Sequence, residues 1–437
     1  MTADNPLDKA PLGWEHWKLF TIISMSLFLD GVLFSLVPTT LYLLPELSSR
    51  ASTILMVNSL SFMLGSLTFG VLSDRVGRRI GLILSLSIYT ISASLFAILT
   101  YSGVLSFIEA ILLTSLINYG VGAEVGPSYA ALSELMPARH RGKMLMLSLN
   151  FWNVGAAIIA SLSLFYTKLT TDLQTVMIYT LLTAISLSIL VFIARLHIPE
   201  SPRWLLLRGR REQAEMIVER FTGRRDIVSI ASESKAISLS QALSRYVGRF
   251  TVLIVVVTSQ LLTYNLAAYY VPYAPGFTFG EQSAPLVVAI SNLGASLGAL
   301  PFIWLIDRSR KHALLFSFAF GFFSSISLIA MLESTSFVPF AISLFINMIF
   351  AEWAYGSIAV LEGELFPTGM RASAAGFITG VAWLLNSAFV GSMILLEAKT
   401  MLVLNSFIWF LGVIASVYWM SKGKETAGRS LEETEKV

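Results

Sequence analysis

Five acidic residues stand inside long apolar runs of the sequence, where a charged side chain is costly: Asp30, Glu109, Glu124, Glu352 and Glu362. A carboxylate withdrawn from water without a cationic partner favours its protonated form, so it takes up a proton in dry surroundings and releases it in wet ones. The sequence shows no Lys or Arg at comparable depth away from the ends of these runs, so we expect these carboxylates to lack such a partner. Their chemistry predicts proton binding and argues against an anionic ligand, which would need a basic side chain.

The composition indicates which elements must hold these residues. The chain has 437 residues, of which 55% are hydrophobic and 13% charged, and its mean hydropathy is +0.73. Soluble domains are about a quarter charged. Many apolar runs reach the roughly 20 residues that a helix needs to cross a bilayer, and a helix satisfies its own backbone hydrogen bonds, as lipid requires. The runs lack the alternation of membrane strands. The sequence therefore predicts an all-α integral membrane protein.

The apolar runs predict twelve transmembrane helices, six on each side of a polar stretch. We place them at about 18–44, 52–73, 80–100, 104–134, 144–168, 174–197, 248–272, 282–306, 313–332, 335–364, 373–396 and 400–420. The runs 104–134 and 335–364 are long for one crossing and are expected to tilt or to extend beyond the lipid. The predicted units are an N-terminal six-helix bundle (1–197), a linker with an amphipathic helix (198–247), and a C-terminal six-helix bundle with its tail (248–437).

The basic residues predict an orientation. All of the 30 Lys and Arg except Arg50, Lys168 and Lys399 fall in the tails, in alternate loops or in the helix ends that face them. By the positive-inside rule, both termini and the linker are cytoplasmic in a multi-pass protein of the plasma membrane. The pI of about 9.0 then reflects contact with the headgroups of the lipid bilayer. Nucleic acid is not expected as a partner, and no cleaved signal peptide is predicted.

Other site chemistries find little support in the sequence. There is no Cys, which excludes disulfides and thiolate metal sites, and the four His residues lie near predicted helix ends. No nucleophile–base set stands out, and the Gly-x-x-x-x-Gly-Lys-Ser/Thr phosphate loop is missing. We expect no metal and no cofactor, and we do not expect an enzyme.

Two charged motifs occur once in each half of the chain. "ELMPARHRG" (134–142) and "ELFPTGMRA" (364–372) follow predicted helices 4 and 10, while "GVLSDRVGRR" (70–79) and "IWLIDRSRKH" (303–312) follow helices 2 and 8. The same order and the same offset of about 230 residues indicate two related six-helix bundles. Bundles related by pseudo-twofold symmetry can move relative to one another around a site at the membrane midplane.

The repeated motifs combine acidic with basic residues on the predicted cytoplasmic side. Anchoring by the positive-inside rule alone would explain the basic residues but not the acidic ones. We predict that these groups form ion pairs that hold the cytoplasmic side closed, each exposed pair contributing about 0–1 kcal/mol. The predicted gating residues are Asp74, Arg75, Arg78, Glu134, Arg141, Glu200, Arg203, Asp307, Arg308, Glu364 and Arg371.

The sequence resembles the major facilitator superfamily, and within it the sugar porter family. "GVLSDRVGRR" matches the superfamily loop Gly-x-x-x-Asp-Arg-x-Gly-Arg-Arg, and "PESPRWL" (199–205) is similar to the sugar porter signature. "SQLLTYNLAAYY" (259–270) and "AWLLN" (382–386) resemble its substrate motifs in helices 7 and 11. The resemblance implies contact with substrate for Gln260, Asn265, Tyr269, Tyr270, Trp383 and Asn386. The amides among them could equally serve helix–helix contacts.

Several positions depart from the sugar porter pattern. Helix 7 has Ser259 for a Gln, helix 11 has Ala382 for a Gln, and helix 5 has Leu149 and Ala156 where sugar-binding Gln residues are frequent. Thr114 stands where the family's helix 4 Arg commonly pairs with a helix 1 acid, the position of Asp30 here.

Helix 4 and its surroundings resemble other members of the superfamily. "GAEVGPSYAALSE" (122–134) is similar to metabolite:proton symporters, which carry a Glu at the position of Glu124. The resemblance implies proton coupling for Asp30 and Glu124, although Glu124 could also be structural. Glu109 and Glu362 could simply reach a membrane interface.

The leading prediction is a secondary active transporter that moves a small hydrophilic solute, a sugar or polyol, by alternating access. Protons are the expected coupling ion in symport, and a monomer is expected to suffice. One alternative is an organic cation or other metabolite, favoured by the missing helix 5 glutamines and the excess of buried acids. A second alternative is a non-transporting sensor on the same scaffold, because fold does not fix function.

Overall fold

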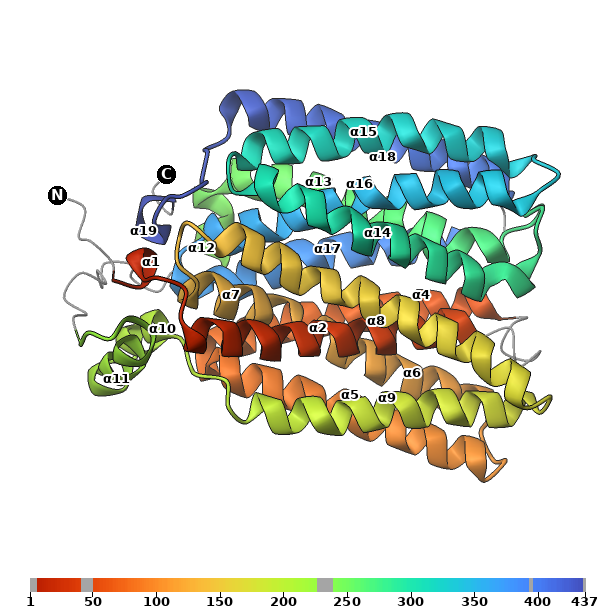
Figure 1. The fold of residues 1–437 in the computed structure, drawn as a ribbon, viewed down its shortest axis with the longest axis horizontal. Helices are drawn as coiled ribbons and strands as arrows, with labels where there is room; N and C mark the ends of the chain where they lie inside the picture. The colour runs from red at the N-terminus through yellow and green to blue at the C-terminus, as the bar shows by residue number, and fades with distance from the viewer. Residues whose placement is uncertain (1–5, 41–49, 226–238, 393–395, 435–437) are drawn as a thin grey trace.

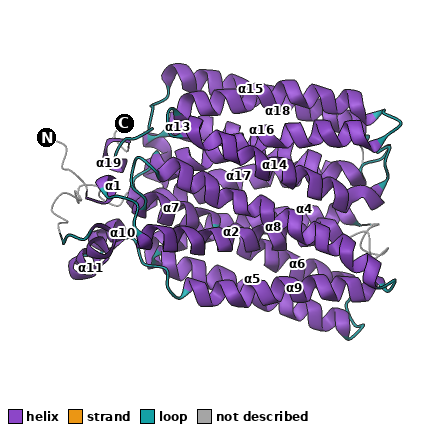
Figure 2. Cartoon of the chain, in the orientation of Figure 1, coloured by secondary structure: helices purple, strands orange, loops and turns teal. Residues whose placement is uncertain are grey.

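The chain folds into a helical membrane-type bundle. The structure is a computed structural model that describes residues 6–40, 50–225, 239–392 and 396–434. These residues form no strand, and they contain twelve helices that are long and apolar enough to cross a membrane. In Figure 1 these helices run side by side, with the first six below the last six, and Figure 2 shows short loops at both ends. The all-α prediction is confirmed.

The first half contains seven long helical segments that make six spans. They are α2 (Trp14–Thr40), α4 (Ala51–Val76), α5 (Arg78–Tyr101), α6 (Phe107–Gly122), α7 (Val125–Leu135), α8 (Arg141–Leu169) and α9 (Leu173–Arg195). The ends agree with the predicted spans to within a few residues, apart from residues 41–44, which lie outside the described residues.

The second half supplies the other six spans. The main helices are α13 (Val247–Asn265), α14 (Ala284–Ile306), α15 (Arg310–Leu332), α16 (Phe337–Glu364), α17 (Arg371–Ser392) and α18 (Ala398–Lys422). α13 continues as a π-helical turn (Leu266–Tyr270) and a 3-10 turn (Val271–Tyr273). Short 3-10 turns precede α14 (Glu281–Ser283) and α17 (Thr368–Met370). Residues 393–395 of the predicted eleventh span lie outside the described residues.

The predicted long fourth helix is interrupted. It ends as α6 at Gly122 and resumes as α7 at Val125, with Glu124 in the interruption. Its start is fixed by a capping box, in which the Ser106 hydroxyl accepts from the Glu109 backbone NH and Glu109 accepts from the Ser106 NH. Glu109 therefore serves as a helix cap at the edge of the bundle.

The two halves meet along two equivalent helix pairs. α4 packs on α17, and α8 packs on α14, which pairs the second span with the eleventh and the fifth with the eighth. At one end of the α4–α17 contact the backbones touch, since a Cβ on Gly70 or on Gly126 would lie 2.7 Å from the carbonyl oxygen of Ala372. Glycine permits this close approach. Elsewhere, large apolar side chains such as Ile91, Phe323 and Trp304 point outward and are exposed, as lipid contact requires.

Short helices gather at one end of the bundle, which we call the terminal face (left in Figure 1). They are α1 (Pro6–Lys9), α10 (Pro202–Leu207), α11 (Arg211–Thr222), α12 (Leu239–Arg245) and α19 (Leu431–Thr434). α11 is the predicted amphipathic helix, and it buries Ala214 and Val218 against the protein. The other end of the bundle is called the opposite face. The division at 198 and 247 stays a prediction, and residues 226–238 lie outside the described ones.

Candidate functional site

A cavity of about 70 Å³ lies between the two halves, and we call it the central cavity. Aromatic rings from both halves line it: Phe34, Phe62, Tyr129 and Trp152 from the first, and Tyr264, Tyr355 and Trp383 from the second. Its polar lining consists of Asn153, Gln260, Asn265, Thr379, Glu352 and Glu362. No Lys, Arg or His is among the described residues that line it. An apolar pocket with a few convergent polar groups is the usual form of a small-molecule site.

Three of the predicted substrate-contact residues line this cavity. Gln260 and Asn265 come from α13, and Trp383 comes from α17. An ideal helix separates Gln260 and Asn265 by about 140°, yet both reach the cavity. The ring of Trp383 stacks on Phe62 of the first half at a centroid distance of 4.1 Å. The amides offer donors and acceptors, and the rings offer flat apolar faces.

The other three predicted substrate-contact residues lie between this cavity and the opposite face. The Tyr269 hydroxyl hydrogen-bonds to Ser35 at 3.0 Å. The Asn386 amide donates to Ser59 and to the Tyr270 hydroxyl, each at 2.9 Å. Because Ser35 and Ser59 belong to the first half, these bonds join the halves and close the cavity on this side.

Two carboxylates of α16 face the central cavity and are buried. One oxygen of Glu352 accepts from the Asn153 amide at 2.7 Å, across the boundary between the halves. The other oxygen of Glu352 and one oxygen of Glu362 have no hydrogen-bond partner among the described residues. Beside them, the Tyr129 hydroxyl donates to Tyr355 at 2.9 Å and again joins the halves. Glu362 thus belongs to the cavity wall and does not reach an interface.

Asp30 and Glu124 form a second acidic cluster, away from the cavity lining. Glu124 makes a buried ion pair with Arg195, whose Nε also donates to Ser26 at 2.9 Å. The Ser85 hydroxyl donates to the other Glu124 oxygen at 3.2 Å. Asp30 is buried beside both charged partners. Arg195 is thus ion-paired with Glu124 and lies near Asp30, one oxygen of which has no hydrogen-bond partner among the described residues.

The expectation that these acids lack a cationic partner is wrong for this cluster. Arg195 stands at the end of α9, where the sequence suggested an interfacial anchor among other basic residues. Its long side chain instead turns inward and is fully buried. An Arg among apolar residues, just inside a helix end, was the available signal. Its direction depends on packing, which the sequence alone does not show.

The predicted gating motif of the first half forms a buried network at the terminal face. Glu134 lies between Arg78, at 3.1 Å, and Arg371 of the second half, at 2.8 Å. Asp74 accepts hydrogen bonds from the backbone NH and the hydroxyl of Ser373, at 2.7 and 2.6 Å. These contacts hold α4 and α7 against α17 and close the cavity on this side.

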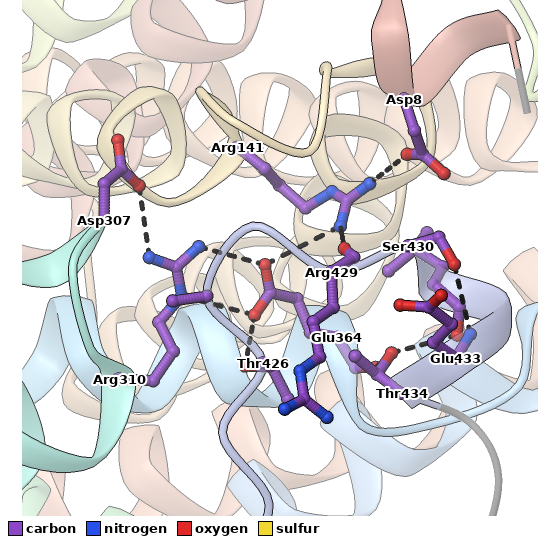
Figure 3. Close-up of polar contacts among 12 residues, drawn as sticks. Asp8, Arg141, Asp307, Arg310, Glu364, Thr426, Arg429, Ser430, Glu433 and Thr434 are labelled. Carbon is purple, nitrogen blue, oxygen red and sulfur yellow. Dashed lines mark hydrogen bonds and ion pairs between the residues drawn. The ribbon is translucent and has the colours of Figure 1, made fainter.

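A corresponding network stands around Glu364 in the second half (Figure 3). Glu364 pairs with Arg310 at 3.2 Å and lies 3.7 Å from Arg141 of the first half. Asp307 pairs with Arg310 at 3.1 Å and accepts from the backbone NH of Lys143. Glu364 and Arg310 thus occupy the places that Glu134 and Arg78 have in the first half.

Two predicted gating residues take no part in this network. Arg75 and Arg308 are exposed and form no ion pair with the described residues. The participating guanidinium of the second half is Arg310, which the sequence prediction missed because the spacing of the two motifs differs by one residue. The ion pairs themselves are buried rather than exposed, so the value for exposed pairs underestimates what breaking one costs.

Residues of the signature "PESPRWL" form hydrogen bonds with the first network and with the start of α5. Glu200 accepts from the backbone NH groups of Arg78 and Arg79 at the start of α5, at 3.0 and 3.3 Å. Burial raises the pKa of the Glu200 carboxyl, and it likewise raises that of Asp307. Arg203 donates to the carbonyl oxygen of Glu134.

Segments near both ends of the described chain join these networks, and the sequence prediction did not include them. Asp8 of α1 lies between Arg141, at 2.5 Å, and Arg203, at 3.2 Å. The Thr426 hydroxyl donates to Glu364 at 2.6 Å (Figure 3). Glu425 accepts from the backbone NH of Arg310 at the start of α15. These short polar segments carried no repeat or membrane signal that would have identified them.

Among the described residues, no group of three or more His, Cys, Asp or Glu side chains is arranged to hold a metal ion. The site is a cavity between the two halves, with contacts between the halves on both sides of it. Two related six-helix halves around such a cavity define a membrane transporter of the major facilitator superfamily. The comparisons with known proteins bear on this class directly.

The chain belongs to the family described as "Sugar (and other) transporter", whose profile matches residues 14–437. It is 26% identical to the glucose transporter GlcP of Staphylococcus epidermidis, over 85% of each protein. It is 25% identical to the inner membrane metabolite transport protein YgcS of Escherichia coli, over 97% of this chain and 95% of that protein. The predictions of the superfamily and of a transporter rather than an enzyme are confirmed.

Solved structures share the fold. The proton:xylose symporter XylE bound to 6-bromo-6-deoxy-D-glucose superposes with a TM-score of 0.81 and 19% identity, covering 96% of this chain and 98% of that one. The inward-open conformation of XylE from Escherichia coli gives a TM-score of 0.69 at 20% identity, over 96% and 99% of the chains.

Proposed function

We propose that the protein is a secondary active transporter that moves a small hydroxyl-bearing solute, a sugar or polyol, by alternating access. The observation that carries this proposal is the central cavity, which both halves line and which contacts between the halves close on either side. Opening one set of contacts at a time would expose the cavity to one side of the membrane at a time.

The cavity lining supports a hydroxylated solute. Asn153, Gln260 and Asn265 can each donate and accept hydrogen bonds, and Trp383 offers an aromatic face to the C–H surface of a sugar ring. Relatives of this chain include glucose transporters from a bacterium and a plant. These features favour a sugar or polyol over an organic acid, for which the cavity lacks a basic residue.

Proton symport is the second part of the proposal. Asp30 and Glu124 share the single guanidinium of Arg195, so full ionisation would leave one uncompensated charge in a dry site. Burying an unpaired charge is expensive, and one bound proton removes it. The structural neighbour XylE is described as a proton symporter. Asp30 and Glu124 are therefore the residues proposed to couple protons to solute movement.

The terminal face is proposed to be cytoplasmic in the plasma membrane. Most Lys and Arg residues of the chain gather there, as the positive-inside rule requires. The buried ion pairs between Glu134 and Arg371, and those around Glu364, would then be the cytoplasmic closure. A monomer contains both halves of the cavity, so no partner chain is needed to complete it.

Transport in liposomes tests the coupling. Purified protein is reconstituted, an inside-alkaline pH gradient is imposed, and uptake of labelled D-glucose, D-xylose and D-sorbitol is measured. We expect gradient-driven accumulation of at least one solute, lost in Asp30→Asn, with solute exchange without a gradient retained. Accumulation that persists in Asp30→Asn contradicts the coupling role, and no uptake of any solute contradicts the transporter proposal.

Cross-linking tests the mechanics. The chain contains no Cys, so Lys143→Cys and Arg308→Cys can be joined specifically across the terminal face by a bifunctional maleimide. We expect the doubly substituted protein to lose solute flux when cross-linked, while each single variant treated identically keeps it. Unchanged flux after complete cross-linking would rule out alternating access through this face.

A further inference from the structure

The charged side chains that line the central cavity among the described residues are all acidic. Glu352 and Glu362 are the carboxylates among its lining residues, and none of the described basic side chains lines it. Both side chains are almost fully buried, with 2% exposure each. Deeply buried acids of this kind are normally paired with a cation.

The protein offers these two acids no internal cation. The five guanidiniums that are fully buried in the described residues are engaged elsewhere: Arg78 and Arg371 with Glu134, Arg141 with Asp8, Arg195 with Glu124, and Arg310 with Glu364. One oxygen of Glu352 and one of Glu362 have no hydrogen-bond partner in the described residues. A buried acceptor without a hydrogen-bond partner destabilises the protein, and it does so more strongly if it is charged. These oxygens therefore point to a ligand that supplies positive charge and hydrogen-bond donors.

The rings around the cavity favour the same kind of ligand. Trp152, Tyr264, Tyr355 and Trp383 all line it, together with Phe34 and Phe62. The faces of aromatic rings attract cations, most strongly in a site shielded from water, and cages of such rings recognise ammonium groups. Carboxylates and rings together select a cationic nitrogen more specifically than either would alone.

We propose that the transported solute carries a positively charged amine beside its hydroxyl groups, as an amino sugar or an amino polyol does, and that Glu352 is its counterion. This inference rests on the proposed transport function and adds the charge of the solute. Glu352 stands next to Asn153, which bonds it at 2.7 Å and itself accepts from the Tyr264 hydroxyl at 3.3 Å. The amine is held at the free Glu352 oxygen, while neighbouring amides take the hydroxyls.

Glu362 lies at a different depth in the protein from Glu352. It follows Glu352 by ten residues on α16, which is about 15 Å along the helix axis, so one nitrogen does not contact both acids. Glu362 lies toward the terminal face, two residues before Glu364 of the ion-pair network. It provides a second binding position for the amine, between Glu352 and the terminal face.

Matched pairs of probes test the charge of the solute. Binding to purified protein and uptake into liposomes are compared for D-glucosamine with D-glucose, and for N-methyl-D-glucamine with D-sorbitol. Each pair differs chiefly by a cationic nitrogen. We expect each amine to bind at least tenfold tighter than its neutral partner at neutral pH. In Glu352→Gln this ratio should fall to near one, while Glu362→Gln should slow amine uptake more than it weakens amine binding.

Controls and contrary outcomes separate this inference from the proposed function. Glu109→Gln, at a helix cap outside the cavity, should keep the wild-type ratio, and thermal stability shows that each variant is folded. Uptake of D-glucose or D-sorbitol with no preference for the amines overturns the inference and leaves the transport proposal standing. An amine preference that survives in folded Glu352→Gln also overturns the assignment. If no probe binds or crosses the membrane, the inference and the transport proposal both fail.

Discussion

The molecule buries two groups of acidic residues in two different ways. In the first half, Asp30 and Glu124 lie beside Arg195; Arg195 also donates to the Ser26 hydroxyl, and the Ser85 hydroxyl donates to Glu124. In the second half, Glu352 and Glu362 face a cavity and each keep an oxygen without a partner. Asp30 also keeps one oxygen without a hydrogen-bond partner, so the two groups differ in their cation: Arg195 lies in the first cluster, and no basic side chain lines the cavity among the described residues. The first cluster therefore has a cation within the fold, whereas Glu352 and Glu362 are the acids that we propose meet a ligand.

The largest loss of stability is expected when Arg195, the cation of the first acidic cluster, is replaced. Arg195→Gln leaves two buried carboxylates without their shared partner, and breaking such a buried pair costs about 3–5 kcal/mol. We expect a strongly lowered midpoint of thermal inactivation in detergent. Adding Glu124→Gln to Arg195→Gln should recover part of the loss, because it removes one of the stranded acids. A single Arg195→Gln variant as stable as the wild type would show that the cluster is not held by its charge.

A somewhat smaller free-energy change is expected when an ion pair at the terminal face is broken. Glu134→Gln keeps the shape of the side chain but leaves Arg78 and Arg371 without the carboxylate that joins them. Hydrogen bonds to charged groups contribute about 1.5–3 kcal/mol, so the closed arrangement should weaken by about that amount. The measurement is the rate of maleimide labelling of a cysteine placed at Val125 in the cavity lining, which should rise. An unchanged rate would contradict a closing role for this pair.

The cavity acids should behave in the opposite way to the internal cluster. Glu362→Gln replaces a buried carboxylate that has no cationic partner by a neutral amide of the same shape, so the stability of the protein should be unchanged or raised by about 1 kcal/mol. Thermal inactivation of Glu362→Gln and Glu124→Gln, measured side by side, makes the comparison direct. A loss above about 1 kcal/mol in Glu362→Gln would mean that this acid is also satisfied by the fold.

The smallest effect is expected at the two predicted gating residues that stay outside the networks. Arg75→Ala and Arg308→Ala alter exposed side chains without ion pairs in the described structure. Surface substitutions of this type change stability by less than about 0.5 kcal/mol. Both variants should also keep solute flux close to that of the wild type. A strong loss of flux in either would show that pairing in another conformation matters.

The fold was predictable because its signals are local. Helix length, apolar composition and the repeated charged motifs are properties of short segments, so the twelve spans and the two related halves follow from them. The interruption between α6 and α7 was expected only as extra length. Glu124 lies in this interruption and pairs with Arg195, a contact between residues far apart in the chain that the sequence alone does not show.

The site was only partly predictable because tertiary packing decides partners. Gln260, Asn265 and Trp383 reach the cavity, as their motifs suggested. Tyr269 follows Asn265 by four residues, which on an α-helix would place them on one face, but the π-helical turn Leu266–Tyr270 changes the register, and Tyr269 contacts Ser35 instead. Whether these six residues contact solute stays a prediction.

The two closures of the cavity differ in chemical kind, and this has a kinetic consequence. On the terminal side, buried ion pairs and tightly apposed backbones must separate. On the opposite side, neutral hydroxyl and amide groups such as those of Tyr269 and Asn386 hold the halves together. We therefore expect unequal activation barriers for opening the terminal side and for opening the opposite side. The protein without solute should mostly adopt the arrangement in which the terminal side is closed. A solute that arrives from the opposite face would then meet a protein in which only neutral hydrogen bonds have to break before the cavity opens.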